Sequence, residues 1–202
     1  MKKIKVKPYA YLIATVLTLI VLGSSYGSCT KFSDRLSDSA IVALDSFHHC
    51  QYMAFSRGIG AAGRRSEQLD YADLLSRHTT AEQLVEIANT DTSRIARLWA
   101  YRILLKKADN QVFDVLKQAL KDTTYVALVS GCSGFEEHYN RAAISVYRYD
   151  SYELKLSNQL RFSLDSLIFF DYMKPCGFER GLLMDFKPHK IYYATVIEEA
   201  DK

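Results

Sequence analysis

The sequence predicts a mainly all-α fold, in which a short stack of helical repeats has flanking capping helices and one short strand near residues 142–149. Two observations support this prediction. The only prolines stand at positions 8, 175 and 188, and long proline-free stretches rich in Leu, Ala, Glu, Lys and Arg favour helix. Between residues 84 and 132, apolar residues recur at helical spacing in a pattern that occurs twice.

The first 28 residues have the pattern of a secretory signal peptide. Lysines stand at positions 2, 3, 5 and 7, an apolar run extends from Ala10 to Gly23, and small residues follow it. The run is shorter than the roughly 20 apolar residues that a membrane-spanning helix needs. We therefore expect residues 1–28 to direct export and to be removed, with an uncleaved membrane anchor as the alternative.

Two cleavage sites fit the end of this run. Ser25-Tyr26-Gly27 offers the small residues that an ordinary signal peptidase reads, whereas Tyr26-Gly27-Ser28-Cys29 resembles a bacterial lipobox, in which the cysteine is acylated. The second site predicts that Cys29 is lipidated and anchors the mature chain to a membrane. This predicts a location at the cell envelope, on the periplasmic or outer face, and leaves the membrane and leaflet open.

Charge and cysteine content limit the partners. The chain carries a formal net charge of +3, and because residues 1–28 hold four lysines and no acidic residue, the remainder carries −1. No positive field remains to attract nucleic acid. In an oxidising compartment Cys50, Cys132 and Cys176 allow one disulfide and one remaining thiol, with the pairing open and buried free thiols as the alternative.

The mature chain is expected to form one compact domain in three parts. Residues 29–65 hold a helical segment and a glycine-rich connector, 66–132 the helical repeats, and 133–202 a mainly helical capping region. Within the repeats, Thr79 with Glu82 or Thr80 with Gln83 fits a capping box, the side-chain pair that satisfies free N–H groups at a helix start.

Residues 66–132 contain two copies of one pattern. A shift of 31 residues places Asp91 on Asp122, and apolar positions match on both sides of the pair. Each copy predicts a helix, a turn that begins with Asp-Thr, and a second helix. The second helices are Ser93–Lys107, which is apolar around most of its circumference, and Thr123–Cys132.

The first copy has HEAT-repeat residues at five positions: Asp91, Ala96, Arg97, Ala100 and Leu104. It therefore resembles a HEAT repeat, and the resemblance implies that Arg97 ties neighbouring turns together by pairing with Asp122. The second copy has Ala127-Leu128 where the apolar-Arg pair belongs, so we expect it to be a degenerate or terminal repeat. With the signal and Cys29, the chain resembles bacterial HEAT-repeat lipoproteins.

The stretch Arg57–Gln68 contains Gly-x-Gly-x-x-Gly at Gly58, Gly60 and Gly63. A dinucleotide-binding loop needs a buried strand before these glycines and a helix directly after them. The sequence before Gly58 shows no clear apolar strand, and two arginines precede the next helix. We interpret the segment as a flexible connector whose glycines permit positive φ angles.

His48-His49-Cys50 is the strongest candidate for metal binding or catalysis. Adjacent residues on a helix point in different directions, and no C-x-x-C or H-x-x-x-H spacing supports a zinc site. Glu136-Glu137-His138 lacks the second histidine of a metalloprotease motif, and no nucleophile motif occurs. The sequence therefore predicts no metal and no cofactor.

These observations favour a non-catalytic helical-repeat protein that binds a protein partner at the cell envelope. The resemblance implies a curved binding surface lined by the second helices of the repeats, from which we expect Arg94, Arg102 and Tyr125 to project. Two alternatives remain, a metal-dependent enzyme that uses the His48–Cys50 region and a purely structural envelope domain. The partner and the oligomeric state stay open.

Overall fold

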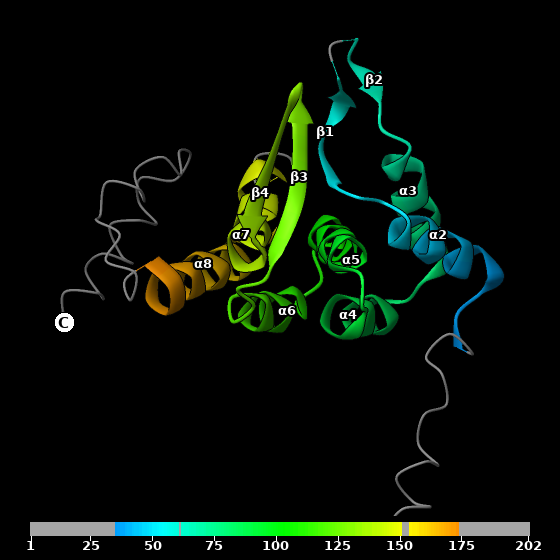
Figure 1. The fold of residues 1–202 in the computed structure, drawn as a ribbon. Helices are drawn as coiled ribbons and strands as arrows, with labels where there is room; N and C mark the ends of the chain where they lie inside the picture. The colour runs from blue at the N-terminus through cyan, green and yellow to red at the C-terminus, as the bar shows by residue number, and fades with distance from the viewer. Residues whose placement is uncertain (1–34, 61, 151–153, 174–202) are drawn as a thin grey trace, which may run out of the picture. The chain divides into compact units, whose positions relative to one another are not determined.

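The computed structural model describes residues 35–60, 62–150 and 154–173. The chain divides into two units, Met1–Leu36 and Ser37–Lys202, and the fold below is that of the second. Its described part combines helices with a β-sheet (Figure 1), so the predicted all-α class is wrong and the fold is α/β. The predicted signal peptide, Cys29, Cys176 and the segment after Pro175 lie outside the described residues.

The described residues contain a four-stranded sheet, seven α-helices and one π-helical segment. The strands are β1 (Met53–Ile59), β2 (Arg64–Arg65), β3 (Tyr125–Gly131) and β4 (Ser133–His138). The helices are α2 (Asp38–His48), α3 (Gln68–His78), α4 (Ala81–Thr90), α5 (Arg94–Lys107), α6 (Val112–Ala119), α7 (Tyr139–Asp150), α8 (Asn158–Leu167) and the π-helix η2 (Ile168–Met173).

The sheet has the strand order β2-β1-β3-β4, in which β1 and β3 are parallel and the other pairs are antiparallel. Met53 lies opposite Leu128, and Ala54 opposite Val129. The next pair is Ile59 with Gly131, so β1 advances five residues while β3 advances two. β1 therefore bulges away from β3 over this interval.

The predicted second helix of the second repeat copy, Thr123–Cys132, is wrong, because these residues include β3. Asp122 still organises the turn before it, since its Oδ1 accepts from the N–H and the hydroxyl of Thr124 at 2.9 and 2.6 Å. The segment that follows is continuously apolar, a pattern that suits a buried helix or a buried strand equally. The parallel partner β1, which is distant in sequence, stabilises the strand, and local periodicity does not reveal that partner.

The short strand predicted near 142–149 is also wrong, because these residues lie within α7. The alternation of polar and apolar residues after Ile144 suggested an extended segment. Instead, five residues of α7 form a buried face at helical spacing: Ala142, Ala143, Ile144, Val146 and Tyr147. α7 packs against α5 and α6 through this region.

The first repeat copy does form the predicted pair of helices, α4 and α5. At the start of α4, the Thr80 hydroxyl accepts from the Gln83 N–H and the Gln83 side chain accepts from the Thr80 N–H, which confirms the second of the two predicted capping boxes. Ser93 caps α5 by accepting from the Ala96 N–H at 3.3 Å. Ten residues of α5 are buried, as the apolar circumference predicted.

The inner face of the sheet packs on α5 and α7 and encloses a buried ion pair. Arg102 of α5 donates through Nε and Nη2 to the Asp150 carboxylate of α7 at 2.6 and 2.7 Å. Its Nη1 donates to the Phe55 carbonyl in the bulge of β1 at 3.1 Å. The guanidinium also lies over the Trp99 ring, 5.0 Å from its centroid. One side chain thus joins two helices and the bulged strand.

Candidate functional site

β3 has one buried face and one open face. Val126 and Leu128 are buried, whereas Ala127 and Val129 are half-buried and Tyr125 is 58% exposed. Because successive strand residues point to opposite sides of a sheet, the first two face inward and the other three outward. Among the described helices only α7 makes extensive contact with both β3 and β4 (Figure 1), so the outer face of these strands carries no packed helix of the described chain.

Two adjoining depressions follow this outer face, and we call them together the groove. One, of about 860 Å³, lies along the C-terminal half of β3 and the glycine-rich hairpin, where Val129, Gly131 and Arg64 are among its lining residues. The other, of about 580 Å³, lies along the N-terminal half of β3, with Tyr125 and Ala127 in its lining. Cys50 and Gln51 line both depressions.

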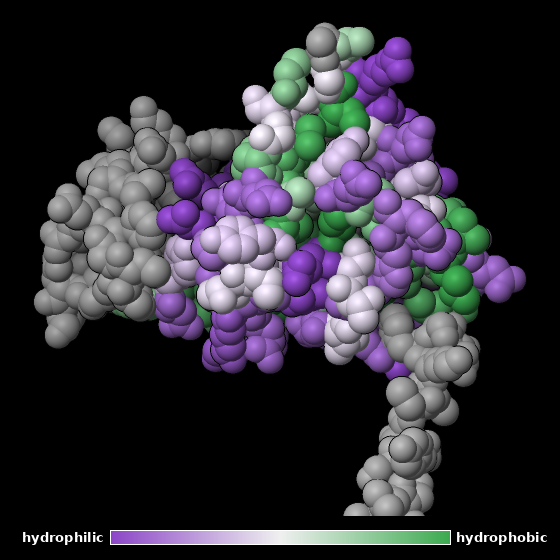
Figure 2. Space-filling view, in the orientation of Figure 1, coloured by the Kyte–Doolittle hydropathy of each residue, from purple (hydrophilic) through white to green (hydrophobic). Residues whose placement is uncertain are grey.

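The groove has a narrow floor and polar borders. Small residues form its floor: Ala127, Val129, Gly131 and Gly134. The connection from α2 to β1 borders it on one side and β4 on the other. Figure 2 shows hydrophobic residues gathered over the upper parts of β1 and β3, with hydrophilic residues beside them. The floor residues place the groove along the outer face of β3, from Ala127 to Gly131.

The glycine-rich segment forms a β-hairpin at the end of the groove, between β1 and β2. A strand, β1, therefore does lead into the glycines and includes Gly58, so the expectation that no strand precedes them is wrong. Gly60 and Gly63 have φ angles of 73° and 59°, as the connector interpretation predicted. The Gly60 N–H donates to the Gly131 carbonyl and the Gly63 N–H to the Gly60 carbonyl, so neither amide is free for a phosphate. A Cβ on Gly58 would lie 3.0 Å from the Gly63 carbonyl oxygen, which explains the first glycine.

Two of the three residues expected to project toward a partner lie together in the groove. Arg94 and Tyr125 line the same depression, and both are exposed. The Tyr125 ring lies beside the His138 ring, with centroids 4.2 Å apart. The expected projection of Arg102 is wrong, because that side chain is only 5% exposed and is paired with Asp150.

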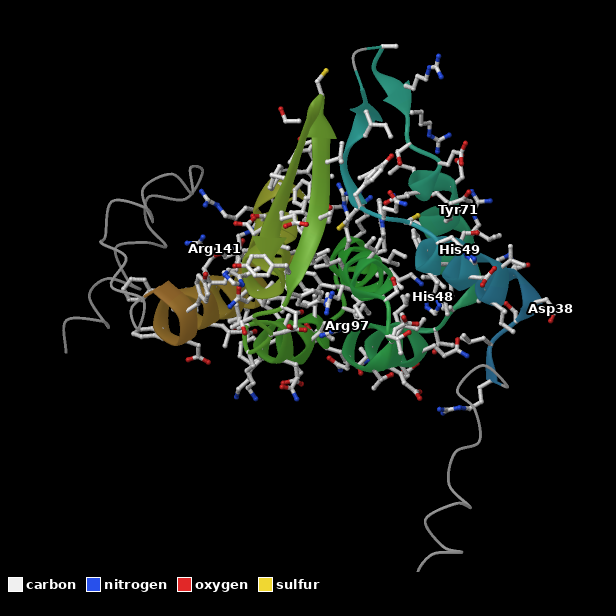
Figure 3. All side chains as sticks on the ribbon, viewed as in Figure 1. Asp38, His48, His49, Tyr71, Arg97 and Arg141 are labelled. Atoms are coloured by element: carbon white, nitrogen blue, oxygen red, sulfur yellow. The ribbon has the colours of Figure 1, made fainter. Side chains whose placement is uncertain are left out.

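The histidines of the His48-His49-Cys50 motif have separate partners. Figure 3 shows His48 and His49 at the end of α2 from which the chain enters β1. His48 Nε2 lies 2.8 Å from Asp91 Oδ1, and His49 Nδ1 lies 2.8 Å from the Asp45 carbonyl. Among the described residues no group of three or more His, Cys, Asp and Glu side chains is arranged to hold a metal ion.

The His48–Asp91 pair resembles part of a catalytic triad, but no hydroxyl or thiol among the described residues is hydrogen-bonded to His48. Cys50, two residues away, donates to the Ser46 carbonyl at 3.3 Å and not to His48. Burial, and next the Glu67 carboxylate, raise the pKa of the Cys50 thiol, which disfavours the reactive thiolate. The pair instead joins the end of α2 to the turn before α5, where Asp91 also accepts from the Ser93 N–H at 2.7 Å.

The ion pair implied by the repeat resemblance is present. Arg97 donates to Asp122 at 2.9 Å and through Nε to the Ala88 carbonyl at 3.1 Å, and its guanidinium lies 4.3 Å from the Tyr139 ring centroid. Burial raises the pKa of the Asp122 carboxyl, whereas the hydrogen bonds from Thr124 and Arg97 and the charge of Arg97 lower it. The lowering effects together are larger, so the pKa of Asp122 lies below its ordinary value. Arg97 therefore ties the two repeat copies together although the second continues as a strand.

Gln68 positions one wall of the groove, and no motif or spacing in the sequence indicates this role. Its Oε1 accepts from the Ala54 N–H and from Trp99 Nε1, each at 2.9 Å, and its Nε2 donates to the Tyr52 carbonyl at 2.7 Å. Burying a side-chain amide costs desolvation free energy, which is offset only when the amide forms hydrogen bonds in the folded protein. Gln68 thereby holds the start of β1 against α5, beside the residues that border the groove.

Comparison with family models finds no match, and comparisons with curated proteins and with solved structures find none either. Within the described ranges, no helix has the length and apolar character needed to cross a membrane.

Proposed function

We propose that this chain is a non-catalytic binding module of the cell envelope, anchored by a lipid on Cys29, and that its groove binds a segment of a protein partner. The observation that supports this proposal is the open outer face of β3 and β4. Sheets in folded domains ordinarily cover their apolar residues with another layer. Here Ala127, Val129 and the exposed Tyr125 border a groove with no packed helix of the described chain above it.

The residue types in the groove fit binding better than chemistry. Arg94, Tyr125 and Glu136 offer charge and an aromatic surface, and Arg and Tyr are common where binding energy concentrates in protein interfaces. In contrast, no hydroxyl or thiol among the described residues is hydrogen-bonded to His48 of the His48–Asp91 pair at the groove. We therefore favour a binding role over the alternative of a metal-dependent enzyme.

Site-specific photo-crosslinking in the native envelope tests the proposal. A photoreactive residue replaces Ala127 on the floor of the groove, and in a control protein it replaces Val42, which is 59% exposed on α2 and lines neither depression. We expect one dominant protein adduct from position 127 that is absent from position 42. No adduct from position 127, or the same adducts from both positions, would contradict a partner-binding groove.

A further inference from the structure

Arginines border the groove at both ends, and two of them have no partner in the part of the chain that the structure describes. Arg65, Arg97 and Arg102 are each paired with a carboxylate. Arg64 and Arg94 are exposed and have no hydrogen-bond or ion-pair partner among the described residues. Since the other lining arginine, Arg65, is neutralised by Asp70 at 2.8 Å, Arg64 and Arg94 are the cations that the groove offers to a ligand.

The Arg94 guanidinium supplies the positive charge at its end of the groove. Arg94 is the first residue of α5, a helix of 14 residues. The partial positive charge of this helix N-terminus is already compensated, because the Asp91 carboxylate accepts from the Ser93 N–H at 2.7 Å. The exposed Arg94 side chain has no such partner among the described residues and lines the same depression as Tyr125, so a carboxylate is the complementary group for this end.

The register of the sheet gives the distance between the two ends. Arg94 lies near Tyr125, at the start of β3, and Arg64 pairs with Ile59 in the hairpin that is hydrogen-bonded to Gly131, at the end of β3. The seven residues of β3 span about 20 Å at roughly 3.3 Å per step. An extended chain of similar length reaches both arginines, with acidic residues about six positions apart on the same side.

The carboxylates in the groove restrict the centre of such a ligand. Glu136 lies opposite Ala127 in the β3–β4 register, between the two ends, and has no ion-pair partner among the described residues. Glu67 lines the depression at the Arg64 end, where it accepts from the Tyr71 hydroxyl at 3.3 Å. An acidic residue in the middle of the ligand would meet Glu136, so the complementary segment is acidic at its two ends and uncharged between them.

We propose that the groove recognises an extended segment of its protein partner that carries two acidic residues about six positions apart, one bound by Arg94 and the other by Arg64. This rests on the proposed function and specifies the chemistry of the partner. Neither residue belongs to the core, because both side chains are exposed. Their charges can therefore be changed without disturbing the fold.

Synthetic peptides of about eleven residues, long enough to span β3, test the proposal by fluorescence anisotropy. The spaced peptide has two glutamates six positions apart among Ser, Thr and Val, and the close peptide has the same composition with the glutamates three apart, on opposite sides of an extended chain. A neutral peptide has glutamines in their place. We expect the spaced peptide to bind most tightly and to weaken with added salt.

Charge-reversal variants of the protein show which arginine binds which glutamate of the peptide. Arg94→Glu and Arg64→Glu should each weaken the spaced peptide about fivefold to tenfold, as expected for exposed ion pairs replaced by repulsion. Arg77→Glu, the same change on the exposed surface of α3 outside the groove, should have no effect. Replacing one glutamate of the peptide with lysine should restore binding to only one of the two variants.

Equal affinity for the spaced, close and neutral peptides, or an equal response to all three reversals, would overturn the proposal. Absence of binding by the spaced peptide would overturn it as well. The crosslink from position 127 distinguishes the proposed function from the proposed acidic ligand. If the crosslink forms but the spaced peptide does not bind, the groove binds its partner by other chemistry and the proposed function stands. If neither the crosslink nor peptide binding is observed, both proposals are contradicted.

Discussion

The two faces of β3 differ in whether their apolar side chains are buried and in whether the arginines beside them are paired. On the inner side Val126 and Leu128 are buried, and the guanidinium of Arg102 is fully occupied by Asp150 and the Phe55 carbonyl. On the outer side the floor residues are small, and Arg94 at the border has no partner in the described chain. The comparison indicates that the inner face maintains the fold and that the outer face is available for binding. Substitutions on the two sides should therefore differ in what they damage.

The largest expected loss of stability follows from Arg102→Ala on the inner side. It leaves the buried Asp150 carboxylate and the Phe55 carbonyl without their donors, and breaking a buried ion pair costs about 3–5 kcal/mol. Urea unfolding measures this loss. The double variant Arg102→Met with Asp150→Leu is the control, since replacing both charges by apolar groups should recover most of the stability. A loss in Arg102→Ala below about 1 kcal/mol, the usual value of an exposed pair, would contradict its role in the core.

The next largest effect is the pH dependence of stability that arises from Asp165, which is also buried in the core. Burial raises the pKa of Asp165 from 3.8 to about 6, although the Tyr147 hydroxyl donates to it at 2.8 Å. Because the folded state binds this proton more tightly than the unfolded state, the contribution of Asp165 is most favourable below pH 4 and is lost as the pH rises through 6. The change is about 3 kcal/mol.

The variant Asp165→Asn isolates this contribution, since the amide oxygen can still accept from Tyr147. The variant should gain stability relative to the wild type as the pH rises from 4 to 7, as measured by urea unfolding at each pH. A difference between the two proteins that stays constant over this range would show that Asp165 does not titrate in this way.

A smaller effect is expected at the hairpin that forms the end of the groove. In Gly63→Ala the new Cβ meets no atom within 4 Å, so only the φ angle of 59° opposes it. The cost should be about 1 kcal/mol. Gly134→Ala, with an ordinary φ and a normal contact to Val129, serves as the control and should be close to neutral in thermal unfolding.

Local signals predicted the parts of this fold that local contacts determine. The capping box at Thr80 and Gln83, the cap at Ser93 and the covered helix α5 were all readable. The pairing of Arg97 with Asp122 followed from the repeat resemblance. Each of these depends on spacing within a short stretch or on a repeated pattern.

The predictions that were wrong depend on contacts between segments that are distant in the sequence. Thr123–Cys132 repeats a pattern that forms a helix in the first copy, but β1 provides a parallel partner and the segment becomes β3. Arg102 was expected at the surface because nothing near it in sequence indicates Asp150. The groove was missed for the same reason, since its borders come from α2, α5, β3 and β4, although Arg94 and Tyr125 were both singled out.

Two neighbouring residues of β3 test the difference between its faces most directly. The free energy of unfolding of Ala127→Lys should lie within about 1 kcal/mol of the wild type, because the new side chain extends from the outer face into solvent. Leu128→Lys places a charge in the core and should cost at least about 3 kcal/mol or prevent folding. Comparable losses in the two variants would contradict the open outer face, and with it the groove on which the proposed function rests.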